Sequence, residues 1–229
     1  SFYGLPKNVI FCKHCVLSNQ RPSSVPEFIQ SNIERKGTLI HNDGICNACK
    51  YNNEKKKIDW EKREQQLIKL LDEHKKKVGY DVIVPGSGGK DSGFAAHILK
   101  YKYGMNPLTV TWAPHLYTDI GLKNFQNWMY VGGLDNFLYT PNGKIHRYLT
   151  SQAFKNLLHP FQPFIVGQKI IGPLMSYKFN VPLVMYGESN AENGDPIEET
   201  KIPTMDKKFF LEQDHSKIKL AGKTIEEII

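Results

Sequence analysis

Cysteine and long apolar runs are both scarce in this sequence of 229 residues. There are four cysteines, and none lies beyond residue 49, which excludes a small scaffold built on many disulfide bonds. No apolar run approaches the roughly 20 residues that a membrane-spanning helix requires. The first residues lack the basic stretch and apolar segment of a secretion signal. We therefore expect a cytoplasmic protein.

The composition and charge are those of a folded protein with one basic region. Hydrophobic residues make up 40% and charged residues 23%, which excludes a disordered chain. The net charge is 30 − 23 = +7, of which residues 1–80 contribute 15 − 9 = +6. Because the excess is local, a nucleic-acid surface along the whole chain is not implied. Two readings stay open: a solvated basic helix, or a polyanionic partner such as RNA, a nucleotide or a nucleotide sugar.

The cysteines form two pairs of the same spacing, Cys12-Lys13-His14-Cys15 and Cys46-Asn47-Ala48-Cys49. Two Cys-x-x-Cys pairs in a cytoplasmic chain are typical of a metal site with four thiolate ligands. Four thiolates leave no coordination position for a substrate, so we expect a structural Zn²⁺ rather than a catalytic one. His14 and His41 are the alternative ligands.

The chain divides by composition into three parts. Residues 1–53 contain little apolar sequence, so we expect a zinc-binding unit that is stabilised by its metal. Residues 54–79 are rich in lysine and glutamate and read as a charged linking helix that ends near Gly79. Residues 80–229 alternate apolar runs with helical patterns, and we expect this domain to continue beyond residue 229.

The third part predicts an α/β fold, with a parallel sheet covered by helices on both faces. The predicted strands are residues 81–84, 107–112, 136–139 and 181–186. The predicted helices are residues 94–103, 122–131 and 151–178, the last broken by Pro160, Pro163 and Pro173. Residues 221–229 read as the start of a helix capped by Thr224.

A glycine-rich segment, Val84-Pro85-Gly86-Ser87-Gly88-Gly89-Lys90-Asp91-Ser92, joins the first strand to the first helix of this domain. Glycines allow the backbone to approach an anion closely, and a helix start offers N–H groups and a positive dipole end. The segment therefore predicts a phosphate-binding loop. It is not a Walker loop, because Asp91 follows Lys90 where that motif requires Ser or Thr, and it lacks Gly-x-Gly-x-x-Gly.

Ser87-Gly88-Gly89-Lys90-Asp91-Ser92 resembles the SGGxDS loop of the PP-loop ATP pyrophosphatases. Two further stretches are similar to the N-acetyl sugar amidotransferases of the pseudaminic-acid and O-antigen pathways. These are the N-terminal pattern Cys12-x-x-Cys15, Arg21-Pro22 and Asp43-Gly44-Ile45-Cys46-Asn47-Ala48-Cys49, and the later segment Tyr186-Gly187-Glu188-Ser189-Asn190-Ala191-Glu192. The extra residues 31–37 depart from the shortest pattern of that family.

The resemblance implies a fold of the adenine nucleotide α-hydrolase type and an AMP-forming reaction. ATP would adenylate the acetamido oxygen of an N-acetyl sugar, and ammonia would replace that oxygen to give an acetamidino sugar, with Mg²⁺ bridging the phosphates. The implied ATP-binding residues are Ser87, Gly88, Gly89, Lys90, Asp91, Ser92, Thr111 and Trp112. The implied catalytic residues are Asp91, Lys90, Glu188 and Glu192, and the implied substrate-binding residues are Asn190 and Glu188.

The resemblance also implies partners. The family takes its ammonia from a separate glutaminase, with a cyclase-like companion. No cysteine lies beyond Cys49, so this chain offers no evident glutaminase nucleophile of its own.

Three other functions are compatible with parts of the sequence. A tRNA-modifying PP-loop enzyme, a thiolase or a lysidine-type ligase, shares the loop and the cysteine pairs. A serine hydrolase would use Ser189 in a Gly-x-Ser-x-Ala turn, with Asp206 and His215 downstream. A zinc-dependent adaptor with a vestigial nucleotide site is the non-enzymatic alternative. His97, His115, His146 and His159 carry no motif, and we assign them to packing or to the surface.

Overall fold

A computed structural model describes residues 5–21, 38–188, 204 and 218–228. By its internal contacts the chain forms two compact units. The first comprises Ser1–Arg63 with Ser189–Leu211, and the second comprises Glu64–Glu188 with Glu212–Ile229. Within the described part of the chain, no helix is both long and apolar enough to cross a lipid bilayer.

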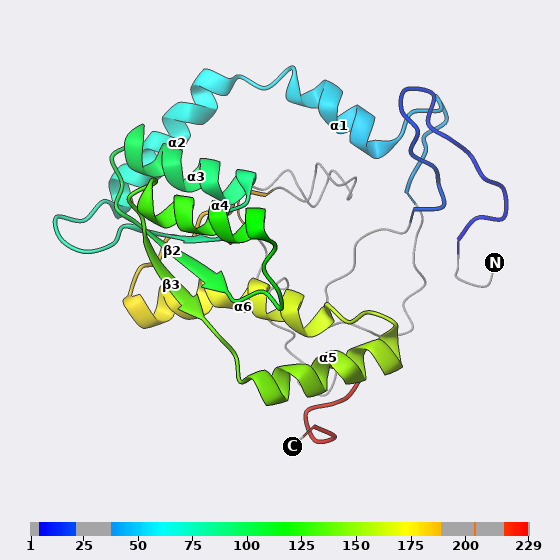
Figure 1. Cartoon of the computed structure of the whole chain (residues 1–229). Coiled ribbons are helices and arrows are strands. Elements are labelled where there is room, and N and C mark those ends of the chain that lie inside the picture. Colours follow the sequence, from blue (N-terminus) through cyan, green and yellow to red (C-terminus); the bar gives the residue numbers. More distant parts are fainter. Residues whose placement is uncertain (1–4, 22–37, 189–203, 205–217, 229) are drawn as a thin grey trace. The chain divides into compact units, whose positions relative to one another are not determined.

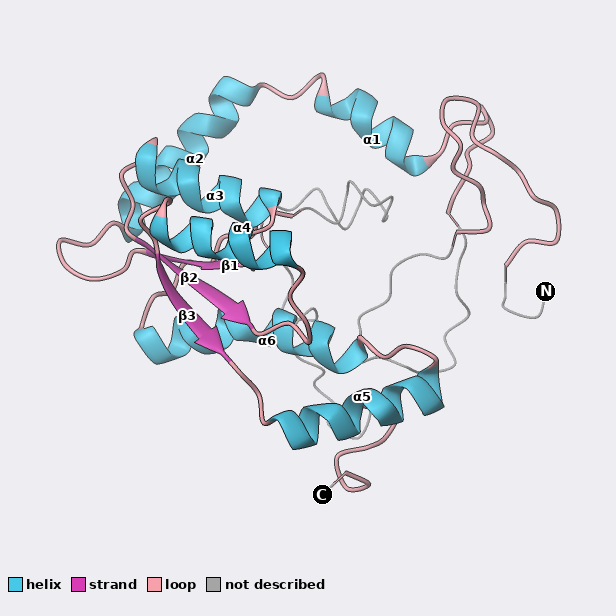
Figure 2. Ribbon diagram, viewed as in Figure 1, coloured by secondary structure: helices cyan, strands magenta, loops and turns pink. Residues whose placement is uncertain are grey.

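Helices and strands alternate along the second unit, as expected for an α/β fold (Figure 2). Two helices precede the sheet, α1 (Asn47–Lys55) in the first unit and α2 (Trp60–His74), whose first turn contains the boundary between the units. The remaining elements are β1 (Val82–Pro85), α3 (Lys90–Tyr101), β2 (Pro107–Trp112), α4 (Asp119–Tyr130), β3 (Asp135–Tyr139), α5 (Gly143–Leu157) and α6 (Gln162–Phe179).

The three strands form a parallel sheet in the order β1-β2-β3, with Val82 opposite Pro107 and Leu108 opposite Asp135. The two faces of the sheet pack against different helices (Figure 1). Val82 and Val84 point toward α3 and α4, whereas Ile83, between them, packs with Ile171 and Met175 of α6. This alternation follows from the two-residue period of a strand, and it confirms the predicted α/β fold with a covered parallel sheet.

The predicted strand 181–186 appears as a single bridge rather than a regular strand. Val184 pairs in parallel with Ile83. The Ile83 N–H donates to the Leu183 carbonyl and the Met185 N–H donates to the Ile83 carbonyl, both at 2.9 Å. Leu183 and Met185 are thus the residues whose backbone groups face β1, and the pairing does not extend into a regular ladder. The segment therefore lies beside β1 on the edge opposite β2, and the strand order reverses between them.

Helix boundaries differ from the prediction where capping decides them. The predicted helical region 151–178 is two helices, with the break before Pro160 as predicted. The first, α5, begins at Gly143, capped by the Asn142 side chain, and ends at Leu157, after which Leu158 is left-handed. Pro163 lies in the first turn of α6, where a missing N–H costs nothing, and Pro173 lies inside that helix. The helix predicted at 94–103 already begins at Lys90.

The charged segment and the chain end also differ. The segment 54–79 does not form one helix, because the helical conformation is interrupted between Lys55, where α1 ends, and Trp60, where α2 begins. Residues 226–228 form a turn rather than a helix start, although the Thr224 N–H does donate to the Glu227 carboxylate at 2.7 Å.

A buried carboxamide fastens the chain end to α6. Gln162, in the first turn of that helix, is fully buried, and its Oε1 accepts from the Ala221 N–H at 2.9 Å. The Ala221 carbonyl accepts from the Asn156 side chain of α5, also at 2.9 Å. A small apolar cluster of Leu149, Ala153 and Ala221 surrounds this contact. Residues 218–223 are therefore part of the second unit.

Alanine substitutions at two glycines inside helices should change the free energy of unfolding in opposite directions. A methyl group at Gly167 of α6 would fall within the Trp112 indole ring, whereas one at Gly93 of α3 would meet nothing within 4 Å. We expect Gly167→Ala to lower the free energy of unfolding by about 1–3 kcal/mol through overpacking. Gly93→Ala should raise it by about 0.5–1 kcal/mol, because alanine favours the helix. Urea denaturation followed by tryptophan fluorescence measures both, and equal effects would contradict the packing of α6 on β2.

Candidate functional site

The glycine-rich loop, residues 86–89, leaves the carboxyl end of β1 and leads directly into α3. Its first residue, Gly86, forms two hydrogen bonds with β2. The Gly86 N–H donates to the Val110 carbonyl at 2.9 Å, and the Thr111 hydroxyl donates to the Gly86 carbonyl at 2.7 Å. The loop also lies where the strand order reverses between β1 and residues 181–186. In open parallel sheets, ligands bind outside the carboxyl ends of the strands at such a point.

Gly88 brings the loop backbone against α4. Its φ is +81°, and a Cβ there would lie 2.8 Å from the Phe125 Cα and 2.9 Å from the Asn124 carbonyl oxygen. Both facts require glycine, since other residues rarely adopt this conformation and no side chain fits the space. The loop is thus held by β2 on one side and α4 on the other.

The start of α3 has the features of an anion site. Gly89 is its N-cap and contributes no side chain, and the first helical bond runs from the Gly93 N–H to the Gly89 carbonyl at 2.9 Å. The first N–H groups of a helix have no partner within it, and they lie at the positive end of the dipole. Lys90 and Asp91 form an ion pair at 2.6 Å, with their side chains 88% and 45% exposed. Both groups are therefore accessible to a ligand.

The segment that ends at Glu188 passes against this same turn. The space that a Cβ of Gly187 would take is filled by the Asp91 carbonyl group and the Ser92 nitrogen. Glu188, the next residue, is exposed. The structure thus brings the loop, Asp91 and the residue before Glu188 together at one edge of the sheet. Asn190 and Glu192 lie outside the described residues, as do Ser189, Asp206 and His215 of the hydrolase alternative.

Thr111 and Trp112, predicted to lie near adenine, face different surroundings. Thr111 is buried, and besides its bond to Gly86 its hydroxyl accepts from the Asn136 carboxamide at 3.0 Å. The half-buried Trp112 stacks on Tyr139, with ring centroids 4.8 Å apart, and packs against α6 at Gly167. Thr111 therefore braces the loop from beneath, and Trp112 joins β2 to β3 and α6.

Two histidines at the same edge were assigned to packing or to the surface. His115 follows β2 and His146 lies in the first turns of α5, and their ring nitrogens Nε2 and Nδ1 are 3.1 Å apart. Burial, and then the neighbouring His115, lower the pKa of His146, so its imidazole is neutral near pH 7. No motif in the sequence indicates this pair, because 31 residues separate its members.

Asn124 and Asn127 of α4 were also missed. With the loop and α3 they line an open pocket of about 330 Å³. Their spacing of three residues places both on one face of a helix, but only the contact at Gly88 shows that this face meets the loop.

In the first unit, the four cysteines lie together, with all four sulfur atoms within 4.8 Å of one another. The Sγ atoms are 4.0 Å apart for Cys12 and Cys49, and 3.7 Å apart for Cys15 and Cys46. A tetrahedral Zn²⁺ with bonds of about 2.3 Å would hold its sulfurs about 3.8 Å apart, so these residues fit the metal. They could hold a metal ion such as zinc.

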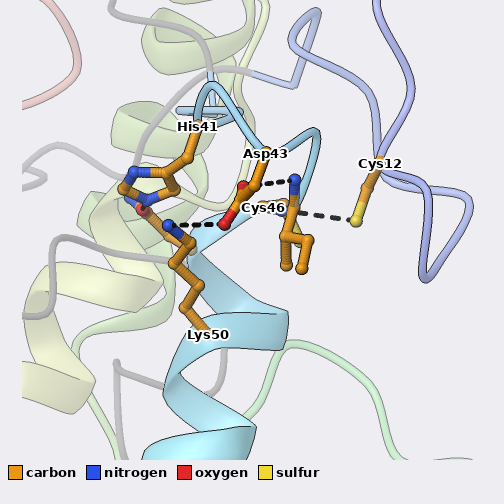
Figure 3. Close-up of polar contacts among 7 residues, drawn as sticks. Cys12, His41, Asp43, Cys46 and Lys50 are labelled. Atoms are coloured by element: carbon orange, nitrogen blue, oxygen red, sulfur yellow. Dashed lines mark hydrogen bonds and ion pairs between the residues drawn. The ribbon is translucent and has the colours of Figure 1, made fainter.

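Local structure orients the cysteines (Figure 3). The Cys46 N–H donates to the Cys12 sulfur at 3.3 Å, and Cys46 is also the N-cap of α1, which carries Cys49 in its first turn. Asp43 supports the preceding turn by accepting from the Ile45 N–H at 3.0 Å and pairing with Lys50 at 3.0 Å. His41 bonds instead to Asn47, at 2.6 Å.

The thiols influence one another's ionisation. Burial raises the pKa of Cys12, but hydrogen bonds from the backbone of Cys46, His14 and Cys15 outweigh it, and its pKa falls to about 6. Burial, and then the neighbouring Cys15, Cys46 and Cys12, raise the pKa of Cys49 to about 12. A first thiolate therefore opposes the formation of others, which is the situation that a bound cation would relieve.

The hydrogen bonds of the Thr111 hydroxyl, which brace the loop from beneath, can be tested by substitution. Thr111→Val keeps the shape of the side chain but leaves the Gly86 carbonyl and the Asn136 amide without the hydroxyl. We expect the free energy of unfolding to fall by about 1–3 kcal/mol. Thr111→Ser keeps the hydroxyl and should lose only about 1 kcal/mol for the missing methyl group. Urea denaturation compares them, and a larger loss for serine than for valine would refute the brace.

In comparisons with known proteins, no family model matches the chain, and no curated protein matches it.

Proposed function

We propose that the chain is an ATP-dependent, AMP-forming amidotransferase that acts on an N-acetyl sugar. The proposal includes membership of the N-acetyl sugar amidotransferases and a PP-loop fold. One observation carries it: a loop of the SGGxDS type starts α3 at the point where the strand order reverses. The identity of the loop residues supports the pyrophosphatase chemistry, and the segment around Glu188 supports the sugar acceptor.

ATP would be held through its phosphates. The backbone of Gly88 and Gly89 and the first turn of α3 face the anion, and the Lys90 ammonium adds a positive charge. The Asp91 carboxylate is a hard oxygen ligand of the kind that Mg²⁺ prefers, and 45% of its side chain is exposed. When bound, Mg²⁺ would neutralise phosphate charge. Lys90, freed from its pair with Asp91, would then be available to the pyrophosphate.

The proposed reaction releases one proton, which the attacking ammonia loses as AMP departs and which the pyrophosphate takes up. The acetamido oxygen attacks the α-phosphorus of ATP, the bond to the β-phosphate oxygen breaks, and pyrophosphate leaves. Ammonia then attacks the amide carbon, and the bond to the oxygen breaks as AMP departs. The product is a positively charged amidinium. Glu188 follows Gly187, whose backbone packs against the turn of Asp91, and we assign its carboxylate to orient ammonia and to stabilise that charge.

The first unit would carry a structural zinc ion on Cys12, Cys15, Cys46 and Cys49. Ammonia would come from a separate glutaminase, assisted by a cyclase-like companion, and the reaction would take place in the cytoplasm. Ammonium chloride at mildly alkaline pH should replace the glutaminase in the test tube, because it supplies free ammonia directly.

The decisive assay combines the chain with ATP, Mg²⁺, ammonium chloride and UDP-N-acetylglucosamine. We expect AMP and pyrophosphate, together with a sugar product in which NH replaces one oxygen, read by mass spectrometry. Asp91→Asn should lower the rate by about 10²-fold or more, since the developing charge loses its metal partner. Asp119→Asn, in the first turn of α4, is the matched control and should keep the rate.

Other outcomes of that assay decide against the proposal. AMP formation that depends on tRNA and not on the sugar would favour the tRNA-modifying alternative. No ATP binding at all would favour the adaptor. Full activity of Asp91→Asn would remove this residue from the mechanism.

The zinc site makes a separate prediction. Cys49→Ser removes one of four thiolates, so bound zinc per chain should fall sharply and the first unit should lose protease resistance. His14→Ala lies between two of the cysteines without removing a thiolate, and should keep its zinc. Elemental analysis by mass spectrometry measures both. Iron in place of zinc, or zinc loss in His14→Ala alone, would contradict a site of four cysteines.

A further inference from the structure

The pocket beside the glycine-rich loop has a second wall that the ATP site does not use. One wall is the loop and the start of α3, with Gly88, Gly89 and Lys90. The other is α4, with Asn124 and Asn127. The two walls meet at Gly88, where loop backbone touches helix backbone. A molecule in this pocket would therefore lie against the same loop that holds the phosphates.

The polar groups of the second wall are two carboxamides one helical turn apart. Both residues are exposed, and within the described part of the chain neither side chain has a hydrogen-bond partner. A carboxamide both donates and accepts, which matches a hydroxyl group that does the same. Two adjacent carboxamides thus suit a ligand with neighbouring hydroxyl groups.

Apolar side chains flank these carboxamides. Phe94 of α3 is 66% exposed and Val131, after α4, is 79% exposed, and both line the pocket. An exposed aromatic ring can cover the C–H face of a sugar ring, and an apolar side chain suits the methyl of an acetyl group. The only charged lining residue among those described is the cation Lys90. The pocket therefore suits a hydroxylated, uncharged ring joined to an anionic carrier.

We infer that this pocket binds the N-acetylated sugar ring, with Asn124 and Asn127 reading its hydroxyl groups. The inference rests on the proposed function and adds the location of its acceptor. Because the pocket shares Gly88 to Lys90 with the phosphate loop, a sugar bound there would present its acetamido oxygen to the α-phosphate. Holding two reactants side by side in this way supplies much of the catalysis in such reactions.

Binding of the acceptor is measured without turnover. The probe is N-acetylglucosamine, observed by saturation-transfer NMR on the full chain, with ATP affinity measured by calorimetry on the same samples. The test variant is the double substitution Asn124→Ala and Asn127→Ala. The control is Gln126→Ala, an exposed carboxamide of the same helix that does not line the pocket. Alanine favours a helix, so both variants should fold, and thermal unfolding checks this.

We expect wild type and Gln126→Ala to transfer saturation to the acetyl methyl of the sugar. The double variant should bind the sugar about tenfold more weakly or worse, since two hydrogen bonds are lost, with its ATP affinity unchanged. The inference is overturned if wild type does not bind the sugar, if the double variant binds it equally well, or if ATP affinity falls in place of sugar affinity. The last result would assign the pocket to the nucleotide.

The two proposals fail separately. If sugar binding is lost in the double variant but wild type never forms AMP, the pocket stands and the amidotransferase reaction falls. If wild type forms AMP and the acetamidino product and the double variant does so with the same KM for the sugar, the reaction stands and the pocket inference falls.

Discussion

The direct contact between the backbone at Gly88 and the backbone of α4 is the constraint on which the candidate site depends. It is possible only because position 88 has no side chain and adopts a positive φ. The contact fixes the distance between the loop and the helix, and with it the aim of the first N–H groups of α3. It also makes one wall of the pocket out of the loop itself. The position of the loop and the pocket beside it thus follow from a single missing Cβ.

The strands and the loop could be predicted because their signals are local. Val82, Ile83 and Val84 form a short apolar run, and the spacing of the cysteines alone predicted the cluster of four sulfurs that could hold a metal ion. Helix boundaries could not be predicted from the prolines alone. The break expected at Pro160 is present, since α5 ends at Leu157, but Pro163 and Pro173 lie within α6, and the Asn142 cap starts α5 before the predicted residue 151. The segment around Val184 was predicted as a strand from its apolar run, but its pairing with β1 is a single bridge at Ile83.

Half of the candidate site was invisible to the sequence for a different reason. Asn124, Asn127, His115 and His146 lie on helices and strand ends whose neighbours are set by tertiary packing, and none belongs to a motif. The same holds for the contacts of Trp112, whose ring stacks on Tyr139 and packs against Gly167 of α6. The nucleotide contact that its place at the end of β2 suggested stays a prediction. The sequence indicates where a residue lies on a helix or strand, but not which residue of another element its side chain contacts.

The buried carboxamide of Gln162 gives the C-terminal stretch an influence beyond its length. Its Oε1 holds the Ala221 N–H within the first turn of α6, and the adjoining Phe161 and Phe164 pack on His115. If residues 219–221 were pulled away, the Gln162 carboxamide would lose its bonds to Lys219 and Ala221, and the first turn of α6 would loosen. Because Phe161 and Phe164 pack on His115, the loosening would reach the aromatic rings at the carboxyl end of β2.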